Sequence, residues 1–174
     1  MTHFPNMETE QLYLRELTLS DREAIFKHFA EPDVTRFMDI EPCRDVKEAE
    51  EIIQFHMDDS GCRYGLFHKS DGEFIGTVGF HCWNQESPSK AEIGFDLSPS
   101  YWGQGLMQEA LTAIIEIGWN KMNLDFIEAT VEQENVRSQH LLNKLNFLKS
   151  TELVNNLFYY TLQKESVGTD IYPI

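Results

Sequence analysis

The stretch LSPSYWGQGLMQEAL, residues 97–111, limits the possible folds of this chain more than any other. It follows a strand-like run, KAEIGFDL at 90–97, and leads into apolar residues at helical spacing, which predict a core-facing helix over 106–121. Another strand-like run, DFIEATVEQ, follows at 125–133. A strand, a helix and a strand in this order predict one β–α–β crossover.

The other β-rich runs are typical of antiparallel hairpins. The sequence predicts further strands at 11–17, 63–69, 73–83, 148–154 and 157–163, and helices at 21–30, 47–59 and 136–145. Four local signals support these boundaries: capping boxes at Ser20 with Glu23 and at Asp45 with Glu48, a hairpin turn at 70–72, and a left-handed helix cap at Asn146. The predicted fold class is therefore α/β, with a mixed sheet and helices on both faces.

Length and hydropathy predict one domain over residues 1–174, with 1–7 and 165–174 as peripheral tails. No apolar run reaches the roughly 18 residues that a membrane span needs. The start MTHFPNMETE lacks a basic flank followed by an apolar core, which is the pattern of a signal peptide. We therefore expect a cytoplasmic protein that does not enter a membrane.

The net charge and the spacing of the cysteines and histidines limit which partners and metal sites we expect. Fourteen basic and 29 acidic residues give a net charge of −15, which disfavours nucleic acid and favours cationic partners, unless it serves solubility alone. Cys43, Cys62 and Cys82 have no CxxC spacing, and the histidines lack ligand spacing. We expect free thiols and no metal site.

The glycines of residues 102–107 fit neither common phosphate-binding motif. A Walker loop requires a lysine after its last glycine, but Leu106 follows Gly105. A dinucleotide fingerprint requires a third glycine where Gln108 stands. A loop without lysine or arginine offers only backbone N–H groups and a helix dipole, which suit a pyrophosphate within a larger ligand. The alternative is a helix entry in which the glycines serve the turn alone.

Four stretches occur together in a fixed order: METEQLYLREL, FIGTVGFHCW, AEIGFDLSPSYWGQGLMQEAL and ENVRSQHLLNKLNF. Over roughly residues 8–164 the chain thereby resembles the GNAT acetyltransferases, and among them the branch that acetylates the N-termini of ribosomal proteins. The resemblance implies a mostly antiparallel sheet with a central splayed parallel pair, 92–97 and 127–133. It also implies direct transfer of an acetyl group from acetyl-CoA to a primary amine in a ternary complex, without a metal.

The resemblance assigns the cofactor-binding residues. They are Leu97, Gly103, Gln104, Gly105, Leu106, Met107, Asn135 and Ser138. An N–H near Leu97 is the expected donor to the oxyanion. The chain departs from the family at Trp102 and Met107, the ends of the loop motif. It also carries Leu142 where many relatives have a tyrosine that protonates the leaving thiolate.

Ser138 is the expected proton donor to the thiolate, because it matches the serine of the branch's NxxS pattern; alternatively it is a helix-surface serine. Asn135 could bind CoA, cap the following helix, or do both. Glu92 is the expected base, within the splayed strand, although it could be an exposed strand residue. Glu132 and His81 are weaker candidates for the base.

The acceptor is constrained by amine basicity. An N-terminal α-amine has a pKa near 7.7–8.0, so about a tenth is neutral at pH 7, against about one lysine amine in a few thousand. An enzyme without a strong base should favour α-amines, and the acidic composition favours a basic protein N-terminus. A polyamine, an aminoglycoside, or a CoA-binding or peptide-binding module without chemistry remain alternatives, as do a monomer and a homodimer.

Overall fold

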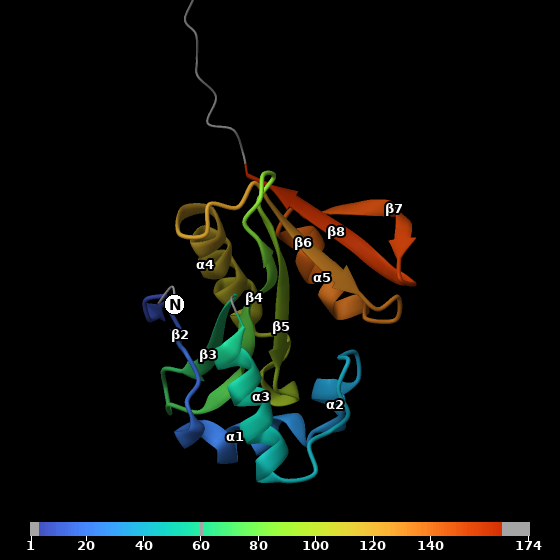
Figure 1. The fold of residues 1–174 in the computed structure, drawn as a ribbon. Helices are drawn as coiled ribbons and strands as arrows, with labels where there is room; N and C mark the ends of the chain where they lie inside the picture. The colour runs from blue at the N-terminus through green and yellow to red at the C-terminus, as the bar shows by residue number, and fades with distance from the viewer. Residues whose placement is uncertain (1–3, 60, 165–174) are drawn as a thin grey trace, which may run out of the picture.

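A computed structural model describes residues 4–59 and 61–164 of the chain. Its central sheet has the strand order β1-β2-β3-β4-β5-β6-β8-β7 (Figure 1). The strands are β1 Met7–Glu8, β2 Leu12–Arg15, β3 Cys62–His68, β4 Phe74–Asn84, β5 Lys90–Leu97, β6 Phe126–Val131, β7 Leu148–Val154 and β8 Leu157–Gln163. All neighbours pair antiparallel except β5 and β6, which are parallel. The predicted fold class is confirmed.

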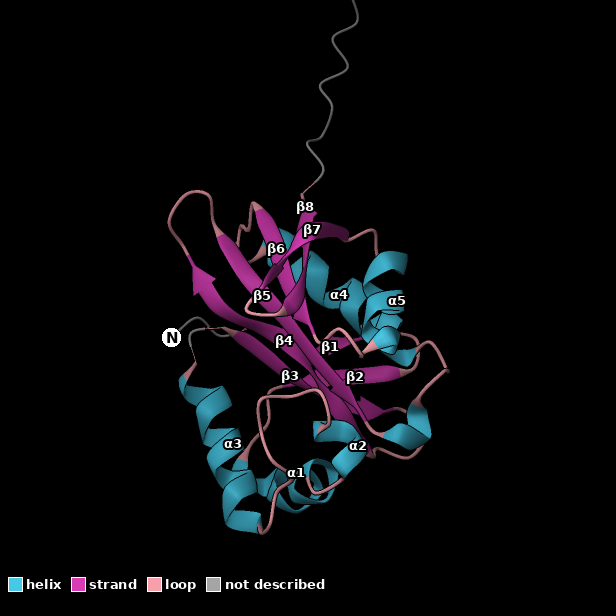
Figure 2. Ribbon diagram, turned by 90° about the vertical axis from the view of Figure 1, so that its right-hand side faces the viewer, coloured by secondary structure: helices cyan, strands magenta, loops and turns pink. Residues whose placement is uncertain are grey.

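Helices cover both faces of the sheet (Figure 2). The helices are α1 Arg22–Phe29, α2 Pro32–Thr35, α3 Val46–Asp58, α4 Leu106–Asn120 and α5 Val136–Lys144, with short 3-10 turns at Leu19–Asp21 and Pro99–Tyr101. The larger apolar core joins α4 and α5 to one face through residues such as Leu111 and Leu142. A smaller core joins α1 and α3 to the other through Ile25 and Ile53. The sheet thus separates the layer of α4 and α5 from the layer of α1 and α3.

The parallel pair opens soon after it begins. β5 and β6 pair at three positions, Lys90 with Phe126, Ala91 with Ile127 and Glu92 with Glu128. Beyond these, β5 continues beside β4 and β6 continues beside β8. The expected splay over 92–97 and 127–133 is therefore present, and the gap begins just after Glu92 and Glu128.

Several local signals describe the structure correctly. The Asp45 side chain caps α3 by accepting from the Glu48 N–H at 3.0 Å. Asn146 adopts a φ of 64° after α5, and Gly72 a φ of 72° in the hairpin turn. The capping box expected at Ser20 is wrong, because a 3-10 turn precedes α1 and the Asp21 carboxylate accepts the Thr18 N–H at 2.8 Å instead.

The N-terminal residues are more tightly packed than the sequence indicates. Phe4, in the segment expected to be a peripheral tail, is 4% exposed and belongs to the larger core. The Tyr64 hydroxyl donates to the Pro5 carbonyl at 2.8 Å, and Met7 pairs with β2. The other expected tail, 165–174, and residues 1–3 lie outside the described residues. Within the described residues, every helix is too short or too polar to cross a membrane.

Candidate active site

Two cavities meet at the splay between β5 and β6. The loop cavity, about 440 Å³, is lined by the glycine loop, the start of α4, one side of α5 and the end of β5. The acidic cavity, about 1310 Å³, is lined by the α2–α3 connection, α3 and the exposed faces of β3 to β6. Both cavities are lined by Phe37, Met38, Phe95, Asp96, Asn135 and Ser138. A ligand in one cavity would therefore meet a ligand in the other at these residues.

The glycine loop forms one wall of the loop cavity. Gly103 and Gly105 have φ values of 74° and 79°, and a Cβ at either would meet no atom within 4 Å. Glycine is thus required by the left-handed backbone and not by crowding. Gly105 is the N-cap of α4, so the N–H groups of Leu106 and Met107 have no partner within the helix. Gln104, expected in the site, instead donates its amide to the Ser100 carbonyl at 3.1 Å and does not line the cavity.

Positive charge reaches the loop cavity from α5. The Arg137 guanidinium lies over the Trp102 ring at 3.4 Å from its centroid, and His140 and Lys144 also line the cavity. The glycine loop has no cations of its own, and α5, the helix that follows β6, supplies them. Residues 137, 140 and 144 are three and four positions apart, which places them on one helix face. That spacing was the available signal for these residues.

The end of β5 presents backbone groups to the gap. The Ser98 N–H donates to the Ile75 carbonyl of β4 at 2.8 Å. Since backbone groups alternate in direction along a strand, the N–H groups of Leu97 and Phe95 point the other way, toward β6. The Leu97 carbonyl accepts from the Trp102 indole at 2.8 Å, which fixes its peptide at the loop. This orientation suits Leu97 as the predicted oxyanion donor.

Asn135 and Ser138 lie where the two cavities join. The Asn135 side chain caps α5 by accepting from the Ser138 N–H at 3.2 Å, so capping is established for Asn135. Ser138 is partly buried and lines both cavities. Leu142 is fully buried in the larger core and lines neither cavity. Because a leucine side chain has no acidic proton, any leaving-group acid would be another residue.

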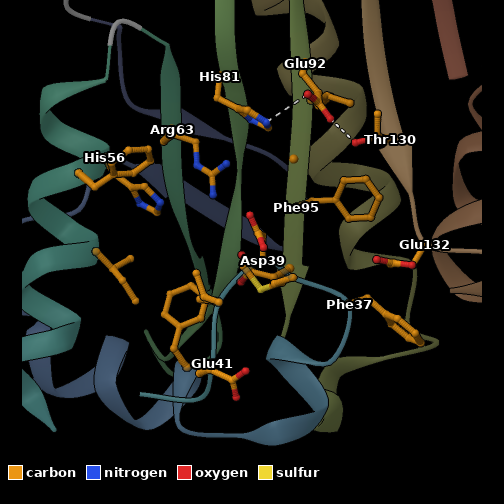
Figure 3. Close-up of a pocket in the computed structure, with 18 of the residues that line it drawn as sticks. Phe37, Asp39, Glu41, His56, Arg63, His81, Glu92, Phe95, Thr130 and Glu132 are labelled. Atoms are coloured by element: carbon orange, nitrogen blue, oxygen red, sulfur yellow. Dashed lines mark hydrogen bonds and ion pairs between the residues drawn. The ribbon is translucent and has the colours of Figure 1, made fainter. Parts of the chain in front are cut away.

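Glu92 lies at the floor of the acidic cavity with two close partners (Figure 3). One carboxylate oxygen accepts from the Thr130 hydroxyl at 2.5 Å, and the other is 3.5 Å from His81 Nε2. The hydrogen bond from His81 lowers the pKa of Glu92, which outweighs the effect of burial. Glu92 is therefore a carboxylate at neutral pH. Glu132 lies further along the cavity wall, beyond Thr130.

A register irregularity at the end of β4 gathers further groups near Glu92. Cys82 has a φ of 52° at this irregularity. It offers a sulfur within 4.8 Å of ligand atoms of His81 and Glu92. Sequence spacing did not reveal this cluster, because adjacent strand residues ordinarily point to opposite faces. The three thiols are free, and those of Cys43 and Cys62 are buried.

A buried network holds α1 to the end of β5. His28 Nε2 is 2.6 Å from Asp96 Oδ1, and His28 Nδ1 is 2.8 Å from the Ser98 hydroxyl. Asp96 also accepts from the Thr77 N–H at 3.0 Å. Burial would raise the pKa of Asp96, but the hydrogen bonds from His28 and Thr77 outweigh it and lower the pKa. The network fixes the strand end that carries Leu97.

The acidic cavity has a strongly negative lining. Two arginines, Arg44 and Arg63, face eight acidic residues there: Asp39, Glu41, Glu48, Glu51, Asp59, Glu92, Asp96 and Glu132. A concave surface lined by one sign of charge concentrates ligands of the opposite sign. The acidic cavity therefore favours a cationic ligand, and the loop cavity, with its free N–H groups and cations, favours an anionic one.

The sequence matches the acetyltransferase (GNAT) domain family over residues 11–148. It is 39% identical over 145 residues to the uncharacterized N-acetyltransferase p20 of Bacillus licheniformis, and the match covers 81% of each chain. It is 34% identical over 98 residues to the ribosomal protein uS5-alanine N-acetyltransferase of Escherichia coli, covering 56% of this chain and 50% of that one. It is 28% identical over 145 residues to the spermidine N(1)-acetyltransferase of Escherichia coli, covering 83% and 77%.

The fold is also found among solved structures. The ribosomal L7/L12 alpha-N-protein acetyltransferase RimL, in complex with coenzyme A, superposes with a TM-score of 0.79 at 17% identity, covering 91% of this chain and 98% of that one. At this identity the likeness concerns the fold.

Proposed function

The chain belongs to the GNAT acetyltransferase family and is an N-acetyltransferase that uses acetyl-CoA, and from this premise we propose that its acceptor is the N-terminal α-amine of a protein or peptide. The observation that carries the proposal is the junction of the two cavities at Asn135 and Ser138. A cavity suited to an anion meets a cavity suited to a cation there. An acetyl donor and a protonated amine would thus be brought together at the splay.

The residues of the loop cavity fit the cofactor. The N–H groups of residues 103–107 and the dipole of α4 would hold its pyrophosphate, with Arg137 and Lys144 adding positive charge. The backbone groups of β5 that face the gap would bind its pantetheine arm as a neighbouring strand would. Acetyl-CoA supplies the acetyl group as a thioester.

Three groups of this chain would then act on the reaction. Glu92 would accept a proton from the protonated amine, directly or through water, which frees the lone pair that forms the new C–N bond. The nitrogen would lose its second proton to solvent once that bond has formed. The Leu97 N–H would donate to the thioester oxygen as it gains negative charge. Ser138 would donate its hydroxyl proton to the sulfur as the C–S bond breaks, and would be reprotonated from solvent.

The state of Glu92 favours an α-amine over a lysine side chain. A carboxylate whose pKa is lowered by its hydrogen-bond partners is a weak base. A weak base suits an acceptor that is already partly neutral at pH 7, as an α-amine is. The acidic lining adds attraction for basic residues that follow the N-terminus.

A polyamine is the second candidate acceptor. The acidic cavity would also attract a polyamine, and the spermidine N(1)-acetyltransferase of Escherichia coli is among the relatives. An acceptor panel separates the two classes. It compares a basic peptide with a free N-terminus, its N-terminally blocked lysine twin and spermidine, with release of CoA thiol as the measurement.

We expect the free-amine peptide to exceed the blocked peptide in kcat/KM by about a hundredfold, because the neutral fractions of the two amines differ by two to three orders of magnitude. Raising the ionic strength should increase KM for the basic peptide more than for a neutral one. If the blocked lysine peptide is the better substrate, the proposal is wrong. If spermidine is best, the enzyme acts on small molecules.

A further inference from the structure

We propose that Arg63, with His56 beside it, binds an oxygen atom of the acceptor, so that the acceptor is an amine with a carbonyl oxygen close to its nitrogen. This inference rests on the proposed function and specifies how the α-amine is recognised. It assigns a specificity-determining role to Arg63, which belongs neither to the glycine loop nor to the proposed catalytic residues.

Arg63 extends from β3 across the floor of the acidic cavity. Figure 3 shows its guanidinium between His56 of α3 and His81 of β4, pointing into the cavity. The guanidinium reaches as far as β5, where a Cβ on Gly94 would lie 3.1 Å from Arg63 Nη1 and 3.2 Å from the His81 ring. Glycine at position 94 therefore leaves room for the Arg63 side chain on the face of β5 that also carries Glu92 and Asp96.

The guanidinium has few partners for its five N–H donors. Its hydrogen bond to the Thr77 hydroxyl is 3.4 Å long, and its Nε is buried without a hydrogen-bond partner. Between residues 4 and 164, leaving out residue 60, no carboxylate lies within 4.0 Å of it. By contrast, Arg15 makes two hydrogen bonds to Asp21, at 2.8 and 2.9 Å. A buried donor without an acceptor destabilises the protein, and a ligand oxygen would supply the missing acceptor.

Unpartnered polar atoms concentrate around Arg63. Among the described residues, five buried side-chain nitrogen or oxygen atoms lack a partner, and three of them belong to His56, Arg63 and His81. All three residues line the acidic cavity. Burial lowers the pKa of His56 to about 4, so this ring is neutral at pH 7 and keeps one donor and one acceptor nitrogen. The cluster is thus built to meet hydrogen-bonding groups of a ligand.

The chemistry of the cavity selects among possible ligands. A free carboxylate on the acceptor would be opposed by the eight acidic residues of the lining. A neutral carbonyl oxygen avoids that repulsion and accepts a charge-assisted hydrogen bond from Arg63. A protonated polyamine offers only N–H donors, so it would leave the Arg63 donors unpaired and add a like charge beside them. A peptide N-terminus carries both the cation and a carbonyl oxygen two carbons away.

The test substitutes Arg63→Met and measures kcat/KM for two acceptors, a peptide with a free N-terminus and an alkylamine that lacks oxygen. We expect at least a tenfold loss with the peptide and less than a twofold loss with the alkylamine. Comparing variant with wild type for each acceptor removes the difference in intrinsic basicity. Arg63→Lys, which keeps the charge but loses the planar fork, should lose part of the peptide activity.

Arg44→Met is the matched control. Arg44 lines the same cavity, but its side chain is 85% exposed and paired with Glu48, so this variant removes one positive charge without touching the cluster. Thermal unfolding and acetyl-CoA affinity establish that each variant is folded. The inference about Arg63 would be overturned if Arg63→Met lost activity equally with both acceptors, or if it acetylated the peptide as well as wild type does. Neither result would overturn the proposed function. A wild-type enzyme that acetylates alkylamines but not peptides would overturn the proposed acceptor as well.

Discussion

The loop cavity and the acidic cavity meet at one strand but draw their binding groups from different sources. The loop cavity depends on backbone N–H groups of a short contiguous segment, completed by one face of α5. The acidic cavity depends on side chains from α3, β3, β4, β5, β6 and the α2–α3 connection. The difference teaches that side-chain substitutions should alter acceptor choice readily, whereas cofactor binding should respond mainly to changes of backbone conformation.

Ser138 lines both cavities, so its substitution tests whether turnover and acetyl-CoA binding can be changed separately at their junction. We expect Ser138→Ala to lower kcat by about a hundredfold, because the role proposed for Ser138, a general acid, acts in the transition state, while the Kd for acetyl-CoA changes by no more than a few-fold. Single-turnover kinetics and titration calorimetry provide the two measurements. Ser138→Thr, which retains the hydroxyl, should restore much of the turnover. A change in Kd without a change in kcat would place Ser138 with the loop cavity only.

The burial of His56 in the acidic cavity can be tested through the pH dependence of the free energy of unfolding. Its pKa is 6.5 in the unfolded chain and about 4 in the folded one, so the unfolded state binds more protons between these values, and acidification favours unfolding. Between pH 7 and 5 we expect wild type to lose about 2 kcal/mol more free energy of unfolding than His56→Gln, which does not titrate there. Urea unfolding at the two pH values measures this difference. Parallel losses in both proteins would mean that His56 is not buried as described.

Gly105 tests the loop cavity through its backbone. A valine at its left-handed φ of 79° should distort the start of α4 and raise the Kd for acetyl-CoA at least tenfold, about 1.4 kcal/mol. Gly72→Val is the control, since Gly72 has a φ of 72° and equally open surroundings in a hairpin turn away from both cavities. Both variants should lose similar stability, but only Gly105→Val should lose affinity. Unchanged affinity in both would remove the loop from the cofactor site.

Much of the fold could be predicted because its signals are local. The cap at Asp45 and the left-handed residue at Asn146 each depend on a few neighbouring residues. The short strand at Met7 and the packing of Phe4 were missed, because two paired residues have no periodicity and only the distant core explains the burial. At Ser20 the same capping signature was misleading, since the capping box forms two residues earlier, between Thr18 and Asp21.

In the candidate site, too, features that depend on contiguous residues could be predicted, and those that depend on distant residues could not. The glycine loop and the splay were predicted from contiguous motifs and from resemblance, and Glu92 was selected for its place at the splay. The partners of Glu92 were not predictable in this form, because His81 and Thr130 come from two other strands whose register the sequence does not state. Arg63 was missed for the same reason, as its neighbours His56, Thr77 and Gly94 lie on three different elements.

The short parallel ladder has a mechanical consequence. Between β5 and β6, three paired positions at 90–92 and 126–128 join a five-stranded plate, β1 to β5, to a three-stranded plate, β6, β8 and β7. α4 packs against the larger plate at β2 and β4, and one apolar core, which includes Ile127 of β6 and Tyr160 of β8, continues across the joint. A ligand that bonds to the open edge of β5 while touching α5 would add a second connection between the two plates where their strands do not pair.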